Sequence, residues 1–172
     1  MISDEVIELQ KYFYQTNNYL EDSKTDKTLI LGIGNYIMGD EGVGVHAIHK
    51  LSKIDLPDNV DIIDGGTGSF NLMPIIARYS EVIFIDATMD NKPVGTVDVL
   101  YPKFSSDFPK TLSVHDVGLK DMLDALEFND ELPKIKLITV TINDMRPMTI
   151  DLSEKIEASL PIVVEKVLDL IK

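Results

Sequence analysis

The chain has 172 residues, of which 44% are hydrophobic and 26% charged, values typical of one globular domain. Its formal net charge of -13 argues against a nucleic-acid partner, because phosphate binding depends on clustered Lys and Arg. The absence of Cys excludes disulfides, thiolate metal ligands and a cysteine nucleophile. The N-terminus lacks a signal-peptide pattern, and no apolar run approaches the roughly 18 residues of a membrane span. We therefore expect a cytoplasmic protein without membrane insertion.

The first part of the chain differs in pattern from the rest. Apolar residues recur at helical spacing within residues 3–20, and Ser3 is a favourable N-cap, so a helix is predicted there. The polar stretch EDSKTDK that follows offers no apolar side chains to bury and is interpreted as a linker. We accordingly divide the chain into a helical extension with its linker, residues 1–27, and one α/β domain, residues 28–172.

Within that domain, strand-like apolar runs alternate with helical patterns. The predicted strands are TLILGIG, VDIIDGG, EVIFIDA, VDVLY and KIKLITVTI. Helices are predicted at residues 41–53, 70–79 and 114–128, and from residue 152, with Pro161 expected to bend or restart the last one. This alternation indicates right-handed βαβ units. The predicted fold is a three-layer α/β/α sandwich with a mostly parallel sheet of about five strands, LILGI and VIFI at its centre, and one antiparallel edge strand.

Acidic residues follow three of the predicted strands. Asp40 and Glu41 come shortly after the first, Asp64 ends the second, and Asp86 ends the third. Ligands of an open parallel sheet bind beyond the carboxyl ends of its strands, so these acids should gather at one rim, where a cation would relieve their repulsion. His115 lies in SVHD just before a helix, and imidazole with carboxylates suits zinc or nickel. The predicted ligand set is Glu41, Asp86 and His115.

Each of these residues also has a simpler interpretation. Asp40 is read as the N-cap of the following helix, a role that Glu41 could share as a first-turn acid. Asp64 is read as a loop organiser that accepts hydrogen bonds from nearby amides. His115 could be a hydrogen-bonding residue at a helix start. Asp86 is harder to explain this way, because it follows four apolar residues on a central strand, where desolvating a carboxylate is costly.

Two further histidines are not assigned to the metal. His46 and His49 share one face of the helix predicted at residues 41–53, opposite its apolar face. A solvated face is therefore the interpretation adopted for both.

The segment GIGN has some likeness to a dinucleotide-binding loop. The third glycine of that motif would fall at Ile37, which makes the match weak. The glycines are instead predicted to let the backbone turn tightly, and Gly42 and Gly44 to let the helix pack closely against the sheet.

Four segments together carry a more specific pattern. They are GIGNYIMGDEGVGVHAI, DGGTGSFNLMPII, IFIDAT with the later PVGT, and SVHDVGLKDMLDAL. In order and spacing they resemble hydrogenase-maturation endopeptidases, from Thr28 to the C-terminus. The resemblance implies an enzyme that removes the C-terminal extension of a nickel-iron hydrogenase large-subunit precursor after nickel insertion.

The resemblance also implies roles for individual residues. Glu41, Asp86 and His115 match the residues that contact nickel carried by the precursor, and they are the candidates for catalysis. Zinc or another divalent metal can be expected at these ligands in vitro. The family's substrate-engaging loop corresponds to Asp64, Gly65, Gly66 and Thr67. The expected partner is the precursor, and the expected state of the enzyme is a monomer.

The chain departs from the family pattern in its additional N-terminal helix and at residues 142–145, INDM, where many members carry a Gly-x-x-Pro turn. Both departures bear on substrate identity. Three alternatives stay open: a germination-type protease of similar fold, a nickel-binding chaperone that does not cleave, and a nucleotide-binding domain suggested by GIG. Nickel-dependent cleavage separates the first two from a maturation endopeptidase, and nucleotide-induced stabilisation tests the third.

Overall fold

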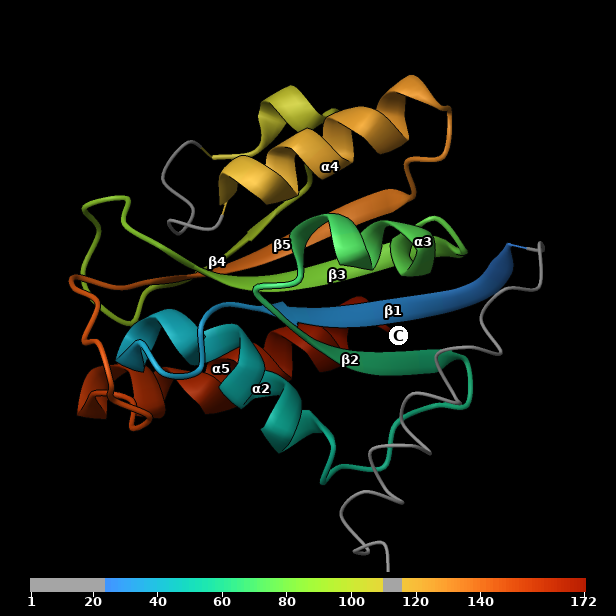
Figure 1. The fold of residues 1–172 in the computed structure, drawn as a ribbon. Coiled ribbons are helices and arrows are strands. Elements are labelled where there is room, and N and C mark those ends of the chain that lie inside the picture. Colours follow the sequence, from blue (N-terminus) through green and yellow to red (C-terminus); the bar gives the residue numbers. More distant parts are fainter. Residues whose placement is uncertain (1–23, 110–115) are drawn as a thin grey trace, which may run out of the picture.

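The structure is a computed structural model that describes residues 24–109 and 116–172 (Figure 1). The helix predicted at residues 3–20 and the candidate ligand His115 lie outside the described residues. Within the described ranges, every helix is too short or too polar to span a lipid bilayer.

The centre of the molecule is a five-stranded sheet with the strand order β2-β1-β3-β5-β4. The strands are β1 (Thr25–Ile33), β2 (Val60–Gly66), β3 (Tyr79–Thr88), β4 (Val97–Leu100) and β5 (Lys134–Thr141). β2, β1, β3 and β5 are parallel, and β4 runs antiparallel to β5 at the edge. The predicted mostly parallel sheet with one antiparallel edge strand is thus confirmed.

Helices cover both faces of the sheet and complete the three layers (Figure 1). One face carries α2 (Val43–Leu51) and α5 (Glu154–Leu170), and the other carries η3 (Ser69–Leu72), α3 (Met73–Ile76) and α4 (Asp116–Phe128). A short turn, η4 (Ser105–Asp107), contacts α4.

Each face of the sheet has its own apolar core, and β3 contributes to both. Val82 and Phe84 belong to the core under α3 and α4, whereas Ile83 and Ile85 belong to the core under α2 and α5. This division follows from the period of two in a strand, which sends successive side chains to opposite faces. It explains why the predicted central strands read as continuous apolar runs.

Several boundaries differ from those predicted. β1 begins at Thr25, before the apolar run that marked it, because the Thr25 amide donates to the Arg78 carbonyl over 2.7 Å and extends the pairing with β3. The helix predicted at residues 70–79 ends at Ile76, since Tyr79 already belongs to β3. In both places backbone pairing within the sheet decides the boundary, not the local apolar pattern.

The last helix is continuous through Pro161, so the predicted restart there is wrong. Buried side chains recur on both sides of the proline at helical spacing, at Ile156, Leu160, Val163 and Val167. Their packing against the sheet outweighs the hydrogen bond that proline cannot make.

Candidate functional site at the carboxyl end of the sheet

The chain leaves β1 through a tight turn and folds back over the end of the sheet. Gly34 has a φ of +135°, and a Cβ atom at this position would lie 2.1 Å from the Glu41 carbonyl oxygen. The Gly34 amide also donates to the Gly66 carbonyl over 2.9 Å. Only glycine allows this return, which brings the next turn, η2 (Gly39–Gly42), onto the strand ends.

This geometry also bears on the dinucleotide-like appearance of GIGN. A phosphate-binding loop needs open space lined by amide groups beside its glycines. Here the space beside Gly34 is filled by the carbonyl oxygen of Glu41, which would repel a phosphate. The loop therefore does not fit the nucleotide-binding alternative.

Helix α2 is pressed against the strands by a second pair of glycines. A Cβ atom on Gly44 would lie 2.3 Å from the carbonyl oxygens of both Ile33 and Ile85, and one on Gly32 would lie 2.3 Å from the Gly44 carbonyl. The close packing predicted for Gly44 is confirmed. The contact fixes the start of α2, and with it η2, against β1 and β3.

Glu41 lies in η2 with none of its surface exposed. Its Oε2 atom accepts a hydrogen bond from the Asn35 amide, in the turn that follows β1. Glu41 does stand in the first turn of η2, but its carboxylate is directed to that preceding turn. Burying a charged group is costly, so its orientation is a specific feature of this fold.

Asp86 is also fully buried, and it lies inside β3, not at its end as predicted, because the strand continues to Thr88. Its Oδ1 atom accepts a hydrogen bond from the Ala87 amide over 2.7 Å. By the alternation of β3, Asp86 projects to the same face as Phe84, the face that α4 covers. Its register partner on β5 is Thr139, and the next pair on this face is Thr88 with Thr141.

The buried face under α4 therefore changes from apolar to polar along its strands. Asp86 and three threonines, each at most 3% exposed, replace the aliphatic and aromatic residues found nearer the amino end. The polar part lies at the carboxyl end of the sheet, where ligands of parallel sheets bind. Residue His115 of the predicted ligand set immediately precedes Asp116, the first residue of α4.

Among residues 24–109 and 116–172, no three His, Cys, Asp or Glu side chains cluster as ligands of a metal ion. The predicted set of Glu41, Asp86 and His115 includes a residue outside these ranges and so stays a prediction. The two described members are buried carboxylates on neighbouring elements, since η2 packs against β3. Oxygen donors of this kind with one imidazole fit a borderline divalent metal.

Asp64 organises the loop that contains Gly65, Gly66 and Thr67, as predicted. Its Oδ1 atom accepts a hydrogen bond from the Gly66 amide over 3.0 Å, and Gly66 has a φ of +48°. The other carboxylate oxygen lies 3.5 Å from the His49 ring. Thr67 is exposed beside this turn.

The prediction that the strand-end acids gather at one rim holds only in part. Asp64 of β2 and Ile85 of β3 are both paired with Gly32 of β1, so these strands reach the same level. However, Asp64 follows Ile62 on the face of α2, whereas Asp86 follows Phe84 on the face of α4. The two carboxylates therefore leave the sheet on opposite sides.

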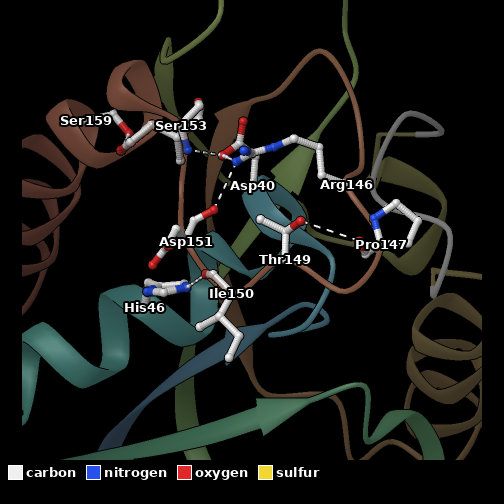
Figure 2. A network of polar contacts seen from close by, with 10 residues as sticks. Asp40, His46, Arg146, Pro147, Thr149, Ile150, Asp151, Ser153 and Ser159 are labelled. Atoms are coloured by element: carbon white, nitrogen blue, oxygen red, sulfur yellow. Dashed lines mark hydrogen bonds and ion pairs between the residues drawn. The ribbon is translucent and has the colours of Figure 1, made fainter.

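The prediction that Asp40 is an N-cap is wrong. The N-cap position of η2 is Met38, without a side-chain hydrogen bond. Asp40 is 3% exposed, and its Oδ1 atom accepts hydrogen bonds from the Ser153 amide over 2.6 Å and from Arg146 Nη2 over 3.3 Å (Figure 2). It therefore anchors the loop between β5 and α5, a contact between distant segments that local sequence does not indicate.

The solvated helix face predicted for the two histidines is correct for His49, which is exposed, but not for His46. The His46 ring stacks against Tyr36 with 4.8 Å between ring centroids, and its Nε2 atom lies 3.0 Å from the Ile150 carbonyl oxygen. Burial lowers the pKa of His46 below its ordinary value. The sequence missed this role because the β5–α5 loop that covers His46 is more than a hundred residues away.

Comparisons with known proteins agree with this architecture. A family model described as hydrogenase maturation protease matches residues 45–170. The hydrogenase 2 maturation protease of Escherichia coli K12 is 35% identical over 146 residues, which is 83% of this chain and 88% of that protein. A hydrogenase expression/formation protein, HupD, of Rhizobium leguminosarum is 32% identical over a match that covers 81% of this chain and 71% of that protein.

Solved structures give the same result. The hydrogenase maturating endopeptidase HybD from E. coli superposes with a TM-score of 0.78 at 34% identity, covering 84% of this chain and 91% of that one. A hydrogenase 2 maturation peptidase from a Thaumarchaeota archaeon gives a TM-score of 0.67 at 29% identity, with coverages of 85% and 99%.

Proposed function

The chain belongs to the hydrogenase maturation protease family and is a peptide-bond hydrolase, and on this premise we propose that it recognises its substrate by nickel. The family acts on precursors of hydrogenase large subunits. The proposed reaction removes the C-terminal extension of such a precursor after nickel has been inserted. Nickel is thus part of the substrate and reports that the precursor is ready.

The observation that carries this proposal is the pair of buried carboxylates at the carboxyl end of the sheet. Glu41 and Asp86 are both fully buried, and each is oriented by a hydrogen bond from a backbone amide, that of Asn35 or of Ala87. Such fixed carboxylates suit a hard or borderline cation brought by a substrate. Together with the imidazole of His115, they would hold nickel and so place the neighbouring peptide bond.

Positioning explains how a site without a cysteine nucleophile can cleave a peptide. A peptide held in one orientation reacts with water as an intramolecular partner would, which removes much of the entropic barrier. A carboxylate at the site, or the metal, polarises that water. The proposal therefore predicts hydrolysis without a covalent intermediate, and a trapped acyl-enzyme during processing would contradict it.

The loop at Asp64, Gly65, Gly66 and Thr67 is proposed to bind the precursor chain. Gly66 adopts a left-handed conformation and is partly exposed, and the exposed Thr67 offers a hydroxyl group beside it. Glycines in a loop next to the site let the backbone of an extended peptide approach closely. This part of the site would act on specificity more than on chemistry.

The decisive experiment incubates the purified protein with nickel-loaded and with nickel-free precursor and weighs the products by mass spectrometry. Cleavage of the nickel-loaded form alone is expected. Cleavage of neither form would defeat the proposal, and binding without cleavage would favour the chaperone alternative. Glu41→Gln and His115→Ala should abolish processing, while full activity of Glu41→Gln would show that Glu41 is only a structural acid of η2.

We further propose that the enzyme works as a monomer in the cytoplasm. The lack of Cys is compatible with a reducing compartment, and the net charge of -13 makes copies of the chain repel one another. Zinc or another divalent metal is proposed to bind the same three ligands in vitro. Light scattering after size-exclusion chromatography tests the monomer, and a dimer mass would contradict it.

A further inference from the structure

Four exposed apolar side chains lie together beside η2, at Tyr36, Ile37, Met148 and Ile150; we call them the rim patch. Ile37 and Ile150 are each 50% exposed and Met148 is 88% exposed. We propose that the rim patch binds an apolar segment of the hydrogenase precursor, and that this binding does not require nickel. The inference rests on the proposed function in its choice of partner, and it adds a second point of recognition to it.

The patch is formed by two segments joined through their backbones. Met38 and Thr149 form a parallel β-bridge. The Thr149 amide donates to the Ile37 carbonyl over 3.1 Å, and the Gly39 amide donates to the Thr149 carbonyl over 2.7 Å. The apolar residues that flank Thr149 are thereby held next to Ile37, so the patch is one surface and not a set of scattered side chains.

The base of the patch is fixed by polar contacts, two of which are made by the buried Asp40 (Figure 2). Asp40 holds both Arg146 and the Ser153 amide, and Arg146 Nη2 in turn donates to the Asp151 carbonyl over 2.9 Å. His46 lies 3.0 Å from the Ile150 carbonyl and stacks against Tyr36. A surface organised before binding loses little conformational entropy when a partner docks, which favours affinity.

Met148 adds an observation of a different kind. Its φ is +59°, a left-handed conformation that is strained for a residue with a side chain. The side chain makes little compensating contact, because it is 88% exposed. Strain of this kind is concentrated at functional positions, and methionine is well suited to adapt to an apolar partner.

The position of the patch identifies its occupant. Residues Tyr36 and Ile37 lead directly into η2, which carries Glu41, so a polypeptide on the patch lies next to the proposed cleavage site. The exposed residues Asp144 and Asp151 belong to the same loop as Met148, and the chain as a whole is acidic. The complementary partner is therefore an apolar segment with neighbouring Lys or Arg, within the precursor that the family processes.

The test measures binding of nickel-free precursor by biolayer interferometry. Met148→Gly removes the apolar side chain and relieves the backbone strain, so it should keep the melting temperature while weakening binding about tenfold or more. The double variant Met148→Gly/Ile37→Ser should weaken it further. The matched control is Ile54→Gly, which truncates a side chain that is 40% exposed beyond the end of α2 and should bind like the wild type.

Unchanged affinity in Met148→Gly, or no binding of nickel-free precursor to the wild type, would overturn the rim-patch proposal. Neither result affects the proposed function, which stands if the wild type cleaves nickel-loaded precursor. Conversely, binding that depends on Met148 without any cleavage would defeat the proposed function and leave the patch in place. With nickel-loaded precursor, Met148→Gly should raise KM and leave kcat unchanged, because the patch contacts no reacting atom.

Discussion

The two ends of β3 each carry one carboxylate, and the residues that surround the two carboxylates differ. Glu81, near the amino end, contacts Lys134 over 3.1 Å and Lys136 over 2.6 Å, and its register partner on β5 is Lys134. Asp86, five residues along the strand, has Thr139 as its register partner and is fully buried. The amino end balances its charge within the sheet, as a stabilising contact requires. The carboxyl end places its charge among hydroxyl groups, which suits the chemistry of a bound ligand.

The largest expected effect comes from neutralising Asp86. In Asp86→Asn the side chain keeps its size and an oxygen that can accept the Ala87 amide, so the fold should persist. Processing of nickel-loaded precursor should fall by at least about 100-fold, more than the 10–100-fold typical of groups that only orient a metal ligand. Product mass spectrometry over time measures the rate, and thermal unfolding checks the fold.

The matched control is Glu81→Gln at the other end of the same strand. It removes one carboxylate from β3 as Asp86→Asn does, but it should leave the processing rate of nickel-loaded precursor unchanged. If Asp86→Asn and Glu81→Gln lost processing activity equally, it would be wrong to assign a stabilising role to the amino end of β3 and a role in the reaction to its carboxyl end.

The next effect concerns how rigidly the carboxyl end is built. Gly44→Ala places a methyl group 2.3 Å from two carbonyl oxygens, and relieving such an overlap should lower the free energy of unfolding by about 1–3 kcal/mol or more. In Gly66→Ala the new Cβ atom would make only an ordinary van der Waals contact, 3.8 Å from Asp64 Oδ1, at a φ of +48°, so its loss should be nearer about 1 kcal/mol. Urea denaturation compares the two variants. Equal losses would show that α2 can move away from the strands, and that the site is less fixed than its contacts indicate.

The features of the sheet also differ in how far they could be predicted from the sequence. The parallel sheet, its central strands and its edge strand follow from local patterns, because apolar runs and turn residues act over a few positions. Asp86 could be singled out for the same reason, as a charge within an apolar strand. The position of Asp86 inside the strand could not be predicted, because its pairing with Thr139 and the pairing of Thr88 with Thr141 extend β3 beyond its apolar part.

Contacts between distant segments account for the remaining differences. The anchoring of the β5–α5 loop by Asp40 joins residues 113 positions apart, and nothing near Asp40 in the sequence indicates it. The local pattern favoured an N-cap, which is the usual role of an acid before a helix. The partial burial of His46 has the same origin, since Ile150 reaches it from that loop. The rim patch likewise arises from a bridge between Met38 and Thr149.

A smaller effect is expected on the stability of the amino end. Burial raises the pKa of Glu81, but hydrogen bonds and charge from Lys136 and Lys134 outweigh it, so its pKa lies below the ordinary 4.5. A lowered carboxyl pKa gives stability that is full above pH 4.5 and is lost as the pH falls through the folded-state value. Glu81→Gln should therefore reduce the free energy of unfolding by about 1–2 kcal/mol at pH 7, between the values for exposed and buried pairs. In acid the two proteins should converge, and persistence of the difference at pH 2 would contradict the ionic origin.

The smallest effect distinguishes the two ends by the pH at which they weaken. The pKa of His46 is lowered by burial and by the nearby His49, which together outweigh the Ile150 carbonyl, Glu157 and Asp151. Above the ordinary value of 6.5 the ring is neutral in both the folded and the unfolded protein and has no effect on pH dependence. As the pH falls below 6.5, the unfolded chain binds the proton more readily, so the folded state loses stability.

The carboxyl end should therefore weaken in mild acid, whereas the contribution of Glu81 at the amino end persists until the pH falls below 4.5. His46→Gln retains a donor for the Ile150 carbonyl but cannot titrate. Between pH 7 and pH 5 its free energy of unfolding should therefore fall less than that of the wild type, by a difference of less than about 1 kcal/mol. Urea denaturation across this pH range, with His49→Gln as the exposed neighbour, measures the difference. An identical slope in the wild type and His46→Gln would show that the contact between α2 and the β5–α5 loop tolerates a charged ring, and that the two ends do not differ in this respect.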